Sequence, residues 1–304
     1  MNQLIVMNQL IAEIKACNAK KVMLQVPEGL KKRAQEIVDA IERSGISVIL
    51  SNDPTYGACD LADDEANALG CDLLVHVGHS KFYVDFKTAV PVLYYPWVFF
   101  VSLDRLDFSS IKEQRIGIVT TIQHLDILQQ VAEHIKKIGK EAVIGGQILG
   151  CWTTNADKID SQVDAYVFFG SGAFHPIALK GKPVYIADME TQTVRCMDPT
   201  CFEKLRIAWI AQARDARSFG ILVSSKKGQY NLLGNAEAIK RRLEEHQRKA
   251  TIIVMREISD QRLLGLGIDA FINTACPRIL DDHFSKPIIN ACDLDLLLND
   301  EGVV

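Results

Sequence analysis

The strongest constraint on the fold of this chain is an internal threefold repeat. Three successive thirds of the sequence contain the same order of short apolar segments, and two landmarks recur at matching spacings. Equivalent aspartates are 92 and 105 residues apart, at Asp72, Asp164 and Asp269. Equivalent prolines are 92 and 104 residues apart, at Pro91, Pro183 and Pro287. The agreement between the two sets of spacings indicates duplication of one unit rather than chance.

Each repeat is predicted to alternate short strands with an amphipathic helix. The opening strands span 21–25, 115–120 and 219–223, and further apolar strands follow in each third. Between the first two strands apolar residues recur at helical spacing, in the first repeat at Leu30, Ala34, Ile37 and Ile41. Continuously apolar strands that alternate with helices are typical of parallel sheets covered on both faces. The sequence therefore predicts an α/β protein of three similar small parallel-sheet domains, at 1–105, 106–205 and 206–304.

Composition and charge exclude several classes of protein. The net charge of −4 and the lack of a long basic run give no support for nucleic-acid binding. The most apolar stretch, 89–101, contains two prolines and is too short to span a bilayer. The amino terminus lacks the basic start of a signal peptide, and its near-duplicated MNQLI leaves either Met1 or Met7 as the start. We therefore expect a cytoplasmic protein without a membrane partner.

Three of the eight cysteines lie just past the carboxyl end of a predicted strand, where open α/β sheets place their ligands. They are Cys59, Cys151 and Cys276. Cys59 and Cys151 follow the second strand of their repeats, whereas Cys276 follows the third, so duplication alone does not explain their positions. The competing interpretation is three unrelated loop thiols. Cys71, in contrast, occupies an apolar repeat position and is expected to be a small buried hydrophobe.

Three convergent thiolates are suited to a [4Fe–4S] cluster, which usually takes four cysteines. With three ligands, one iron keeps an open position that can bind a substrate. A zinc site on the same cysteines is the alternative, although structural zinc usually takes closely spaced pairs and a fourth protein ligand. We expect the three domains to stand in a pseudo-threefold arrangement around a central iron–sulfur cluster.

Six short motifs occur at 24–30 (LQVPEGL), 53–60 (DPTYGACD), 77–80 (VGHS), 149–151 (LGC), 224–229 (SSKKGQ) and 275–278 (ACPR). Together they resemble the motifs of the diphthamide synthase family, 2-(3-amino-3-carboxypropyl)histidine synthase. The resemblance extends from about residue 20 to 295 and is nearest to the archaeal homodimeric form, because the chain lacks the extensions of the eukaryotic subunits.

The resemblance implies a transferase that starts diphthamide biosynthesis. Family members hold a [4Fe–4S] cluster with one cysteine from each of three domains, and Cys59, Cys151 and Cys276 match those positions. With an electron donor, they cleave S-adenosylmethionine into 5′-methylthioadenosine and a 3-amino-3-carboxypropyl radical. The radical is added to one histidine of translation elongation factor 2. Like the family, this chain lacks the CxxxCxxC triad of ordinary radical S-adenosylmethionine enzymes. We expect a homodimer with a complete site in each chain.

Glycine-rich strand ends are the predicted cofactor-binding segments. Pro27, Glu28 and Gly29 end the first strand and open a helix, where backbone amides favour an anion and Glu28 is able to accept from a hydroxyl or an ammonium. A plain strand-to-helix turn is the alternative. The third strands of the first two repeats end in two further candidate segments, Gly78, His79 and Ser80, and Gly170, Ser171 and Gly172.

Charged residues of the third domain and two histidines complete the predicted site. Lys227, Gln229 and Arg278 are candidates for binding a carboxylate, with a solvated turn as the alternative. His79 and His175 are candidate catalytic residues, His79 as an acceptor of the proton lost from the substrate imidazole. A structural hydrogen-bonding role is the alternative for both histidines.

Two other functions are compatible with the architecture. Quinolinate synthase also unites three α/β domains around a three-cysteine [4Fe–4S] cluster, which acts there as a Lewis acid, but the Pro-Glu-Gly and Tyr-Gly-Ala-Cys motifs argue against it. A non-catalytic partner subunit is the second alternative, and the presence of all three cysteines disfavours it.

Overall fold

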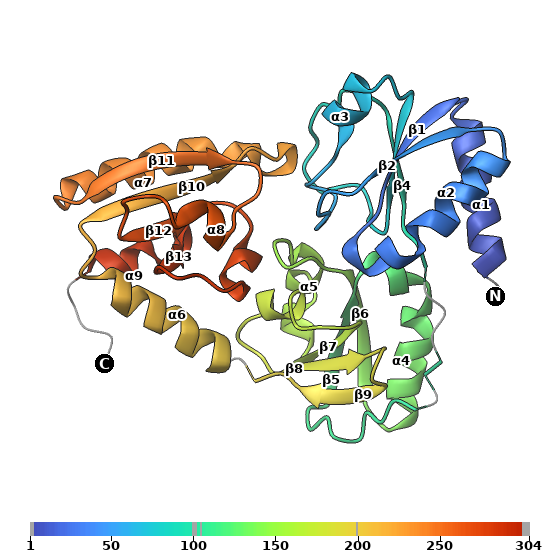
Figure 1. Cartoon of the computed structure of the whole chain (residues 1–304). Helices are drawn as coiled ribbons and strands as arrows, with labels where there is room; N and C mark the ends of the chain where they lie inside the picture. Colours follow the sequence, from blue (N-terminus) through green and yellow to red (C-terminus); the bar gives the residue numbers. More distant parts are fainter. Residues whose placement is uncertain (1–2, 99–101, 104, 199, 300–304) are drawn as a thin grey trace. The chain divides into compact units, whose positions relative to one another are not determined.

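Each third of the chain forms its own sheet in the computed structural model, which describes residues 3–98, 102–103, 105–198 and 200–299 (Figure 1). The first sheet has the order β2-β1-β3-β4, with β1 Lys21–Gln25, β2 Ser47–Ser51, β3 Leu73–Val77 and β4 Val92–Tyr95. The second has the order β6-β5-β7-β8-β9, with β5 Arg115–Thr120, β6 Glu141–Gln147, β7 Ala165–Phe169, β8 Val184–Asp188 and β9 Thr193–Cys196. The third has the order β11-β10-β12-β13, with β10 Ser218–Ser224, β11 Lys249–Met255, β12 Ala270–Asn273 and β13 Ile288–Asn290.

The predicted α/β fold class is confirmed, because the first four strands of every sheet pair in parallel and in the same order. One strand departs from the prediction. β9 pairs antiparallel with β8 and adds an edge strand to the second sheet. The carboxylate of Asp188 accepts from the amides of Glu190 and Thr191 in the connecting turn, at 2.9 and 3.1 Å.

Helices cover the sheets as the periodicity predicts. In the first domain they are α1 Gln3–Ala16, the 3₁₀ helix η1 Glu28–Arg33, α2 Ala34–Arg43 and α3 Asp63–Ala68. In the second they are η2 Ile122–Ile127, α4 Leu128–Lys137, α5 Thr154–Asp157, η3 Asp160–Gln162 and η4 Pro176–Ala178. In the third they are α6 Thr200–Ala213, η5 Lys227–Leu232, α7 Leu233–Glu245, α8 Asp260–Leu263, η6 Pro277–Asp281, η7 Ala291–Asp293 and α9 Leu294–Leu298.

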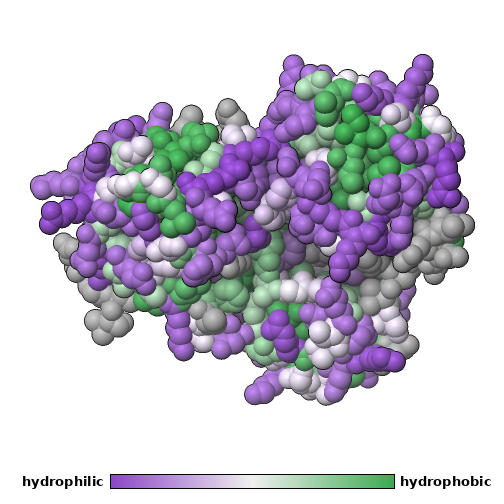
Figure 2. Space-filling model, in the orientation of Figure 1, coloured by the Kyte–Doolittle hydropathy of each residue, from purple (hydrophilic) through white to green (hydrophobic). Residues whose placement is uncertain are grey.

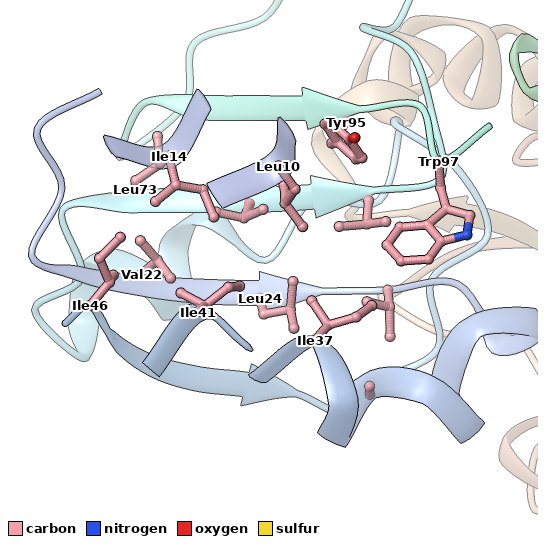
Figure 3. Close-up of a cluster of buried hydrophobic side chains, with 14 of the residues drawn as sticks. Leu10, Ile14, Val22, Leu24, Ile37, Ile41, Ile46, Leu73, Tyr95 and Trp97 are labelled. Carbon is pink, nitrogen blue, oxygen red and sulfur yellow. The ribbon is translucent and has the colours of Figure 1, made fainter. Parts of the chain in front are cut away.

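The core of the first domain lies between β1, β3 and two helices (Figure 3). Leu10 and Ile14 of α1 and Ile37 and Ile41 of α2 are completely buried against this face of the sheet. Alternate residues of the same strands, such as Met23 and Leu74, face a second cluster beneath α3. α1 was not among the predicted sheet-covering helices, and its packing shows that the amino-terminal segment belongs to the first domain.

The outer strands β2, β6 and β11 are less buried than the central strands. Each exposes an apolar side chain, namely Leu50, Ile144 and Val254. On the face shown in Figure 2, hydrophilic residues surround the apolar patches. Over the described residues, no helix combines the length and the apolar character that crossing a membrane requires.

The chain divides into two compact units. The first contains the first two sheets. The second contains the third sheet together with Gly150–Trp152 and Phe174–Ala178, two short segments from loops of the second domain. The predicted boundary at 205/206 falls inside α6. The pseudo-threefold arrangement about one centre stays a prediction.

The aspartates that mark the repeat have a common structural role at the amino end of each sheet. Asp72 Oδ2 accepts from the amides of Lys20 and Lys21 at 2.8 and 2.9 Å. Asp164 Oδ2 accepts from the amide of Arg115 at 3.1 Å, and the Arg115 guanidinium also binds it. Asp269 Oδ2 accepts from the amide and hydroxyl of Ser218 at 2.9 and 2.7 Å. Each carboxylate therefore ties the start of one central strand to the start of its neighbour.

We expect these three aspartates to make the stability of the fold depend on acid. Hydrogen bonds from Lys21, Arg115 and Ser218 lower the pKa of Asp72, Asp164 and Asp269, respectively, below the usual 3.8. A lowered folded-state pKa contributes stability that is complete above the unfolded value and is lost as pH falls through the folded value. The triple Asp→Asn variant should have a lower free energy of unfolding in urea at about pH 7, and a weaker decline below about pH 4.

The control for this experiment is Asp85→Asn, which removes an exposed ion pair with Lys81. Such pairs contribute little to stability. An unchanged acid profile in the triple variant would contradict the proposed role of the repeat aspartates.

Candidate functional site

Cys59 lies in the loop between β2 and α3, and a buried glutamine at the end of β1 holds that loop. Gln25 is 1% exposed. Its Nε2 donates to the Asp60 carbonyl at 2.8 Å, and its Oε1 accepts from the Ala62 amide at 3.3 Å. The Asp60 amide donates to the Gly57 carbonyl at 3.0 Å and closes the turn around Cys59. The cysteine itself is partly exposed.

Cys151 follows β6 in the segment Gly150–Trp152. The Gly150 amide donates to His175 Nδ1 at 3.2 Å, and both residues belong to the second unit. Gly150 also approaches Phe174 closely, because a Cβ at this position would lie 2.6 Å from the ring Cζ. Burial lowers the pKa of His175 to about 4, so the ring is neutral and accepts through Nδ1. His175 therefore orients the loop that carries Cys151, while its predicted catalytic role stays a prediction.

Cys276 follows β12 and precedes the 3₁₀ helix η6. Asn273, 2% exposed, donates from Nδ2 to the Cys276 carbonyl at 2.9 Å. Its Oδ1 accepts from the Ala275 amide at 2.9 Å. Thr274 donates from its hydroxyl to the Leu222 carbonyl at 2.8 Å, which ties the turn to β10. A buried side chain thus holds this cysteine loop too.

The chemistry of the three cysteines fits an iron–sulfur cluster. All three are partly or fully exposed at the carboxyl ends of strands, and each loop is fixed independently of its thiol, by Gln25, His175 or Asn273. Cys71 differs, because it is 6% exposed and burial raises the pKa of its thiol, as expected for a small buried hydrophobe. Within the described residues, no three His, Cys, Asp or Glu side chains form a ready metal site. Convergence of the three sulfurs stays a prediction.

His79 ends a buried hydrogen-bonded chain that starts at the Cys59 loop. Gln25 Oε1 lies 2.9 Å from His76 Nδ1, and His76 Nε2 lies 3.0 Å from His79 Nδ1. His76 is completely buried, whereas His79 is partly exposed. His79 lies seven residues after the aspartate of its repeat, the position that Cys276 occupies in the third repeat. The first repeat therefore places an imidazole where the third places a candidate metal ligand.

The Pro27 turn and the Gly78 turn pack on each other. Gly78 has a φ of +90°, and a Cβ there would lie 2.8 Å from Pro27 Cγ, so only glycine fits. Glu28 opens η1 as predicted, and its exposed carboxylate pairs with Lys31 at 2.6 Å. Gly29 lies in the same 3₁₀ turn. The predicted strand-to-helix turn is thus present, and its role in cofactor binding stays a prediction.

Two side chains of the second domain contact the turn that follows β3 in the first domain. All of these residues belong to the first unit. Gln147 Nε2 donates to the Ser80 hydroxyl at 2.9 Å, and Gln123 Nε2 donates to the Gly78 carbonyl. Gly170, Ser171 and Gly172 follow β7 as predicted, and the exposed Ser171 hydroxyl donates to Asp188 at 3.3 Å.

Of the two adjacent lysines in the third domain, Lys226 is buried, whereas the predicted candidate Lys227 is partly exposed. Lys226 is 7% exposed and its Nζ lies 3.0 Å from Glu257 Oε2. The partly exposed Lys227 begins η5, and the Gln229 amide donates to the Lys226 carbonyl at 2.8 Å. Arg278 lies in η6 and contacts Asp282 at 3.5 Å. Its buried ammonium makes Lys226 a further candidate for binding an anion.

Sequence reasoning missed three residues of this region, Gln25, His76 and Asn273, and it selected Lys227 rather than its neighbour Lys226. A signal for two of them was present. His76 and Asn273 both lie four residues after the repeat aspartate, at the end of otherwise apolar third strands, where the second repeat has Phe168. Buried polar residues at one repeated position indicate a hydrogen-bonding role.

Comparisons with known proteins extend over almost the entire chain. A family model described as a putative diphthamide synthesis protein matches residues 26–303. The 2-(3-amino-3-carboxypropyl)histidine synthase of Pyrococcus horikoshii is 36% identical over 311 residues, covering 96% of this chain and 89% of that protein. Subunit 1 of the Homo sapiens synthase is 31% identical over 316 residues, covering 95% of this chain and 70% of that subunit.

Two solved structures are also similar. The crystal structure of Dph2 from Pyrococcus horikoshii has a TM-score of 0.85 at 34% identity, covering 98% of this chain and 91% of that one. The crystal structure of the same protein with a 4Fe-4S cluster has a TM-score of 0.84 at 34% identity, covering 97% and 91%. The likeness therefore includes all three sheets.

Proposed function

The chain belongs to the diphthamide synthesis protein family, and on this premise we propose that it is a 2-(3-amino-3-carboxypropyl)histidine synthase, a transferase that carries out the first step of diphthamide biosynthesis. The observation that carries this proposal is the identity of 36% over 96% of the chain to a synthase of that name. The matching structure with a 4Fe-4S cluster supports it, because the three predicted cysteine ligands lie in separate, independently held loops.

Cys59, Cys151 and Cys276 would hold a [4Fe–4S] cluster through their thiolates. When bound, such a cluster supplies one electron for cleavage of a carbon–sulfur bond and an open iron position for the substrate. S-adenosylmethionine is the proposed donor of the aminocarboxypropyl group, and a histidine of translation elongation factor 2 is the acceptor. An electron donor, a homodimeric state and a cytoplasmic location complete the proposal.

The protein residues contribute orientation and charge. The 3-amino-3-carboxypropyl group carries a carboxylate and an ammonium. Lys226, Lys227 and Arg278 lie at the carboxyl end of the third sheet, where a carboxylate would find positive charge. Glu28 lies at the carboxyl end of the first sheet and offers the complementary negative charge for an ammonium. Fixing either charged group of the substrate would select which carbon–sulfur bond faces the electron source.

We expect the reduced, cluster-loaded protein to convert S-adenosylmethionine into 5′-methylthioadenosine. Release of that nucleoside requires cleavage on the amino-acid side of the sulfonium, which is the side that carries the transferred group. The measurement is chromatographic analysis of the nucleoside products under anaerobic conditions, with mass spectrometry of elongation factor 2 for the added group.

Two controls make this experiment decisive. Protein without reductant should release neither nucleoside, and elongation factor 2 with the target histidine replaced should stay unmodified. 5′-Deoxyadenosine as the main product would refute the proposed bond cleavage. The absence of any cleavage would favour the quinolinate-type or the partner-subunit function.

A further inference from the structure

The buried chain that joins Gln25, His76 and His79 determines where each of its hydrogens lies. Its first member is fixed by the backbone. The Asp60 carbonyl is only able to accept and the Ala62 amide only to donate, so the Gln25 side chain directs Nε2 to the first and Oε1 to the second. Gln25 therefore presents an acceptor oxygen to His76.

The second member follows from the first. His76 Nδ1 lies 2.9 Å from Gln25 Oε1, which has no hydrogen to give, so Nδ1 must carry one. Burial, together with nearby His79, lowers the pKa of His76 well below 6.5, and the ring is neutral. A neutral ring with its hydrogen on Nδ1 has a lone pair on Nε2.

The third member is His79, whose Nδ1 lies 3.0 Å from His76 Nε2. Because the His76 nitrogen accepts, His79 Nδ1 must donate. The lone pair of neutral His79 is then on Nε2, the nitrogen opposite to the buried chain. This ring is partly exposed, and its repeat position is that of Cys276 in the third sheet.

We propose that Gln25 and His76 hold His79 in the Nδ1–H tautomer, so that His79 Nε2 accepts the proton released when the substrate histidine is alkylated. This inference rests on the proposed function. The net reaction breaks a carbon–sulfur bond, forms a carbon–carbon bond and breaks one imidazole C–H bond. The sulfonium becomes a neutral thioether and one proton is released, which His79 Nε2 accepts; the electron lent at the start is returned when the ring regains aromaticity.

The buried chain of Gln25, His76 and His79 suits a proton acceptor at its end, because protonation of His79 leaves the hydrogen bonds of the chain in place. An imidazolium at His79 keeps its Nδ1–H donated to His76 and gains its new hydrogen on Nε2. The opposite tautomer would turn the lone pair toward the buried His76 and leave a hydrogen on Nε2. His76 and Gln25 are thus positioning residues, and His79 is the catalytic residue.

The direct test is the tautomer itself, measured by two-bond ¹H–¹⁵N correlation spectra of the full chain with ¹⁵N-labelled histidine. The chain has seven histidines, so His79→Gln and His76→Gln identify the two ring signals by their loss. At about pH 7.5, where an ordinary histidine is mainly neutral, we expect hydrogen on Nδ1 and a lone pair on Nε2 for both rings. A predominant Nε2–H form of His79 would overturn the proposal.

A pair of variants tests the role of His76. His76→Phe keeps a ring but removes the acceptor, whereas His76→Gln restores an oxygen able to accept from His79 and an amide able to donate to Gln25. We expect His79 to lose its tautomer preference in the first and keep it in the second. In the loaded enzyme, the ratio of alkylated histidine to 5′-methylthioadenosine should fall about 10–100-fold in His76→Phe, as for other positioning partners, and recover in His76→Gln. His79→Gln should lower this ratio by about 100-fold or more.

The outcomes separate this inference from the proposed function. An unchanged product ratio in His76→Phe with an altered tautomer would overturn the proton-acceptor role alone. No 5′-methylthioadenosine from the wild-type protein would overturn the proposed function and the acceptor role with it. The spectra of the wild-type chain decide the tautomer in either case without a cluster, and the His79→Gln and His76→Gln variants serve only to assign the two ring signals.

Discussion

Cys59→Ala, Cys151→Ala and Cys276→Ala should each remove most of the iron and the broad visible absorbance of the reconstituted protein. Each loop is held by a hydrogen bond that does not involve its thiol, so the fold should survive while a ligand is lost. Changes to outer-shell partners of metal sites already cost about 10–100-fold, so the loss of a direct ligand should lower 5′-methylthioadenosine formation by more than about 100-fold. Iron and sulfide analysis, absorbance and product analysis measure the effect.

The matched control is Cys71→Ala. Its side chain is buried in the apolar cluster beneath α3, and its loss should cost about 1–2 kcal/mol or less of unfolding free energy. Iron content and product formation should be retained. Full cluster occupancy in any of the three ligand variants, or equal iron loss in Cys71→Ala, would contradict the assignment of the ligands.

Phe271→Ala should destabilise the third domain by about 3–5 kcal/mol, measured by urea unfolding. The side chain of Phe271 is 1% exposed and packs in the cluster between β10, β12 and η6. Its register partner on β10 is Gly220, and a Cβ at Gly220 would lie 2.6 Å from the Phe271 ring. The ring thus fills the space that a side chain on the neighbouring strand would need.

This geometry predicts strong coupling between the two positions. Gly220→Ala alone should cost about 1–3 kcal/mol, because the new methyl group overlaps the ring and Ile253 Cδ1. In the Phe271→Ala background the ring is absent, so the methyl group of Gly220→Ala enters the cavity that the ring leaves. The double variant should therefore lose less unfolding free energy than the two single variants lose together. Leu296→Ala, at a side chain that is 39% exposed, is the control and should change stability little. Additive effects would contradict the packing described here.

The three sheets could be predicted because two independent features of the sequence indicate the repeat. Apolar strands and amphipathic helices alternate, and the aspartates and prolines recur at matching offsets. The antiparallel β9 escaped prediction because it is a short, exposed edge strand, Thr193–Cys196, with no apolar run. α1 escaped because its apolar residues are scattered around the helix, and only its packing in the first domain reveals which of them are buried.

The sequence predicted the parts of the candidate site whose residue type alone indicates a function. It missed the parts whose function depends on which residues the fold brings together. Cysteines after strands indicate a metal site through their residue type. Gln25 and His76, in contrast, are single polar residues inside buried strands, and their role depends on a hydrogen-bonded chain between residues 51 positions apart. Lys226 and Lys227 are neighbours of the same type, so the sequence does not distinguish the buried one from the partly exposed one.

The position of the repeat aspartates at the amino ends of the sheets has an evolutionary consequence. After duplication, one end of every sheet retained the same aspartate contact, as Asp72, Asp164 and Asp269 show. The opposite end was then free to diverge, and equivalent positions there became His79, Ser171 and Cys276. A loop at the carboxyl end of a sheet does not contact the aspartate at the amino end. Residues of that loop were therefore able to change in each copy while the aspartate contact was kept.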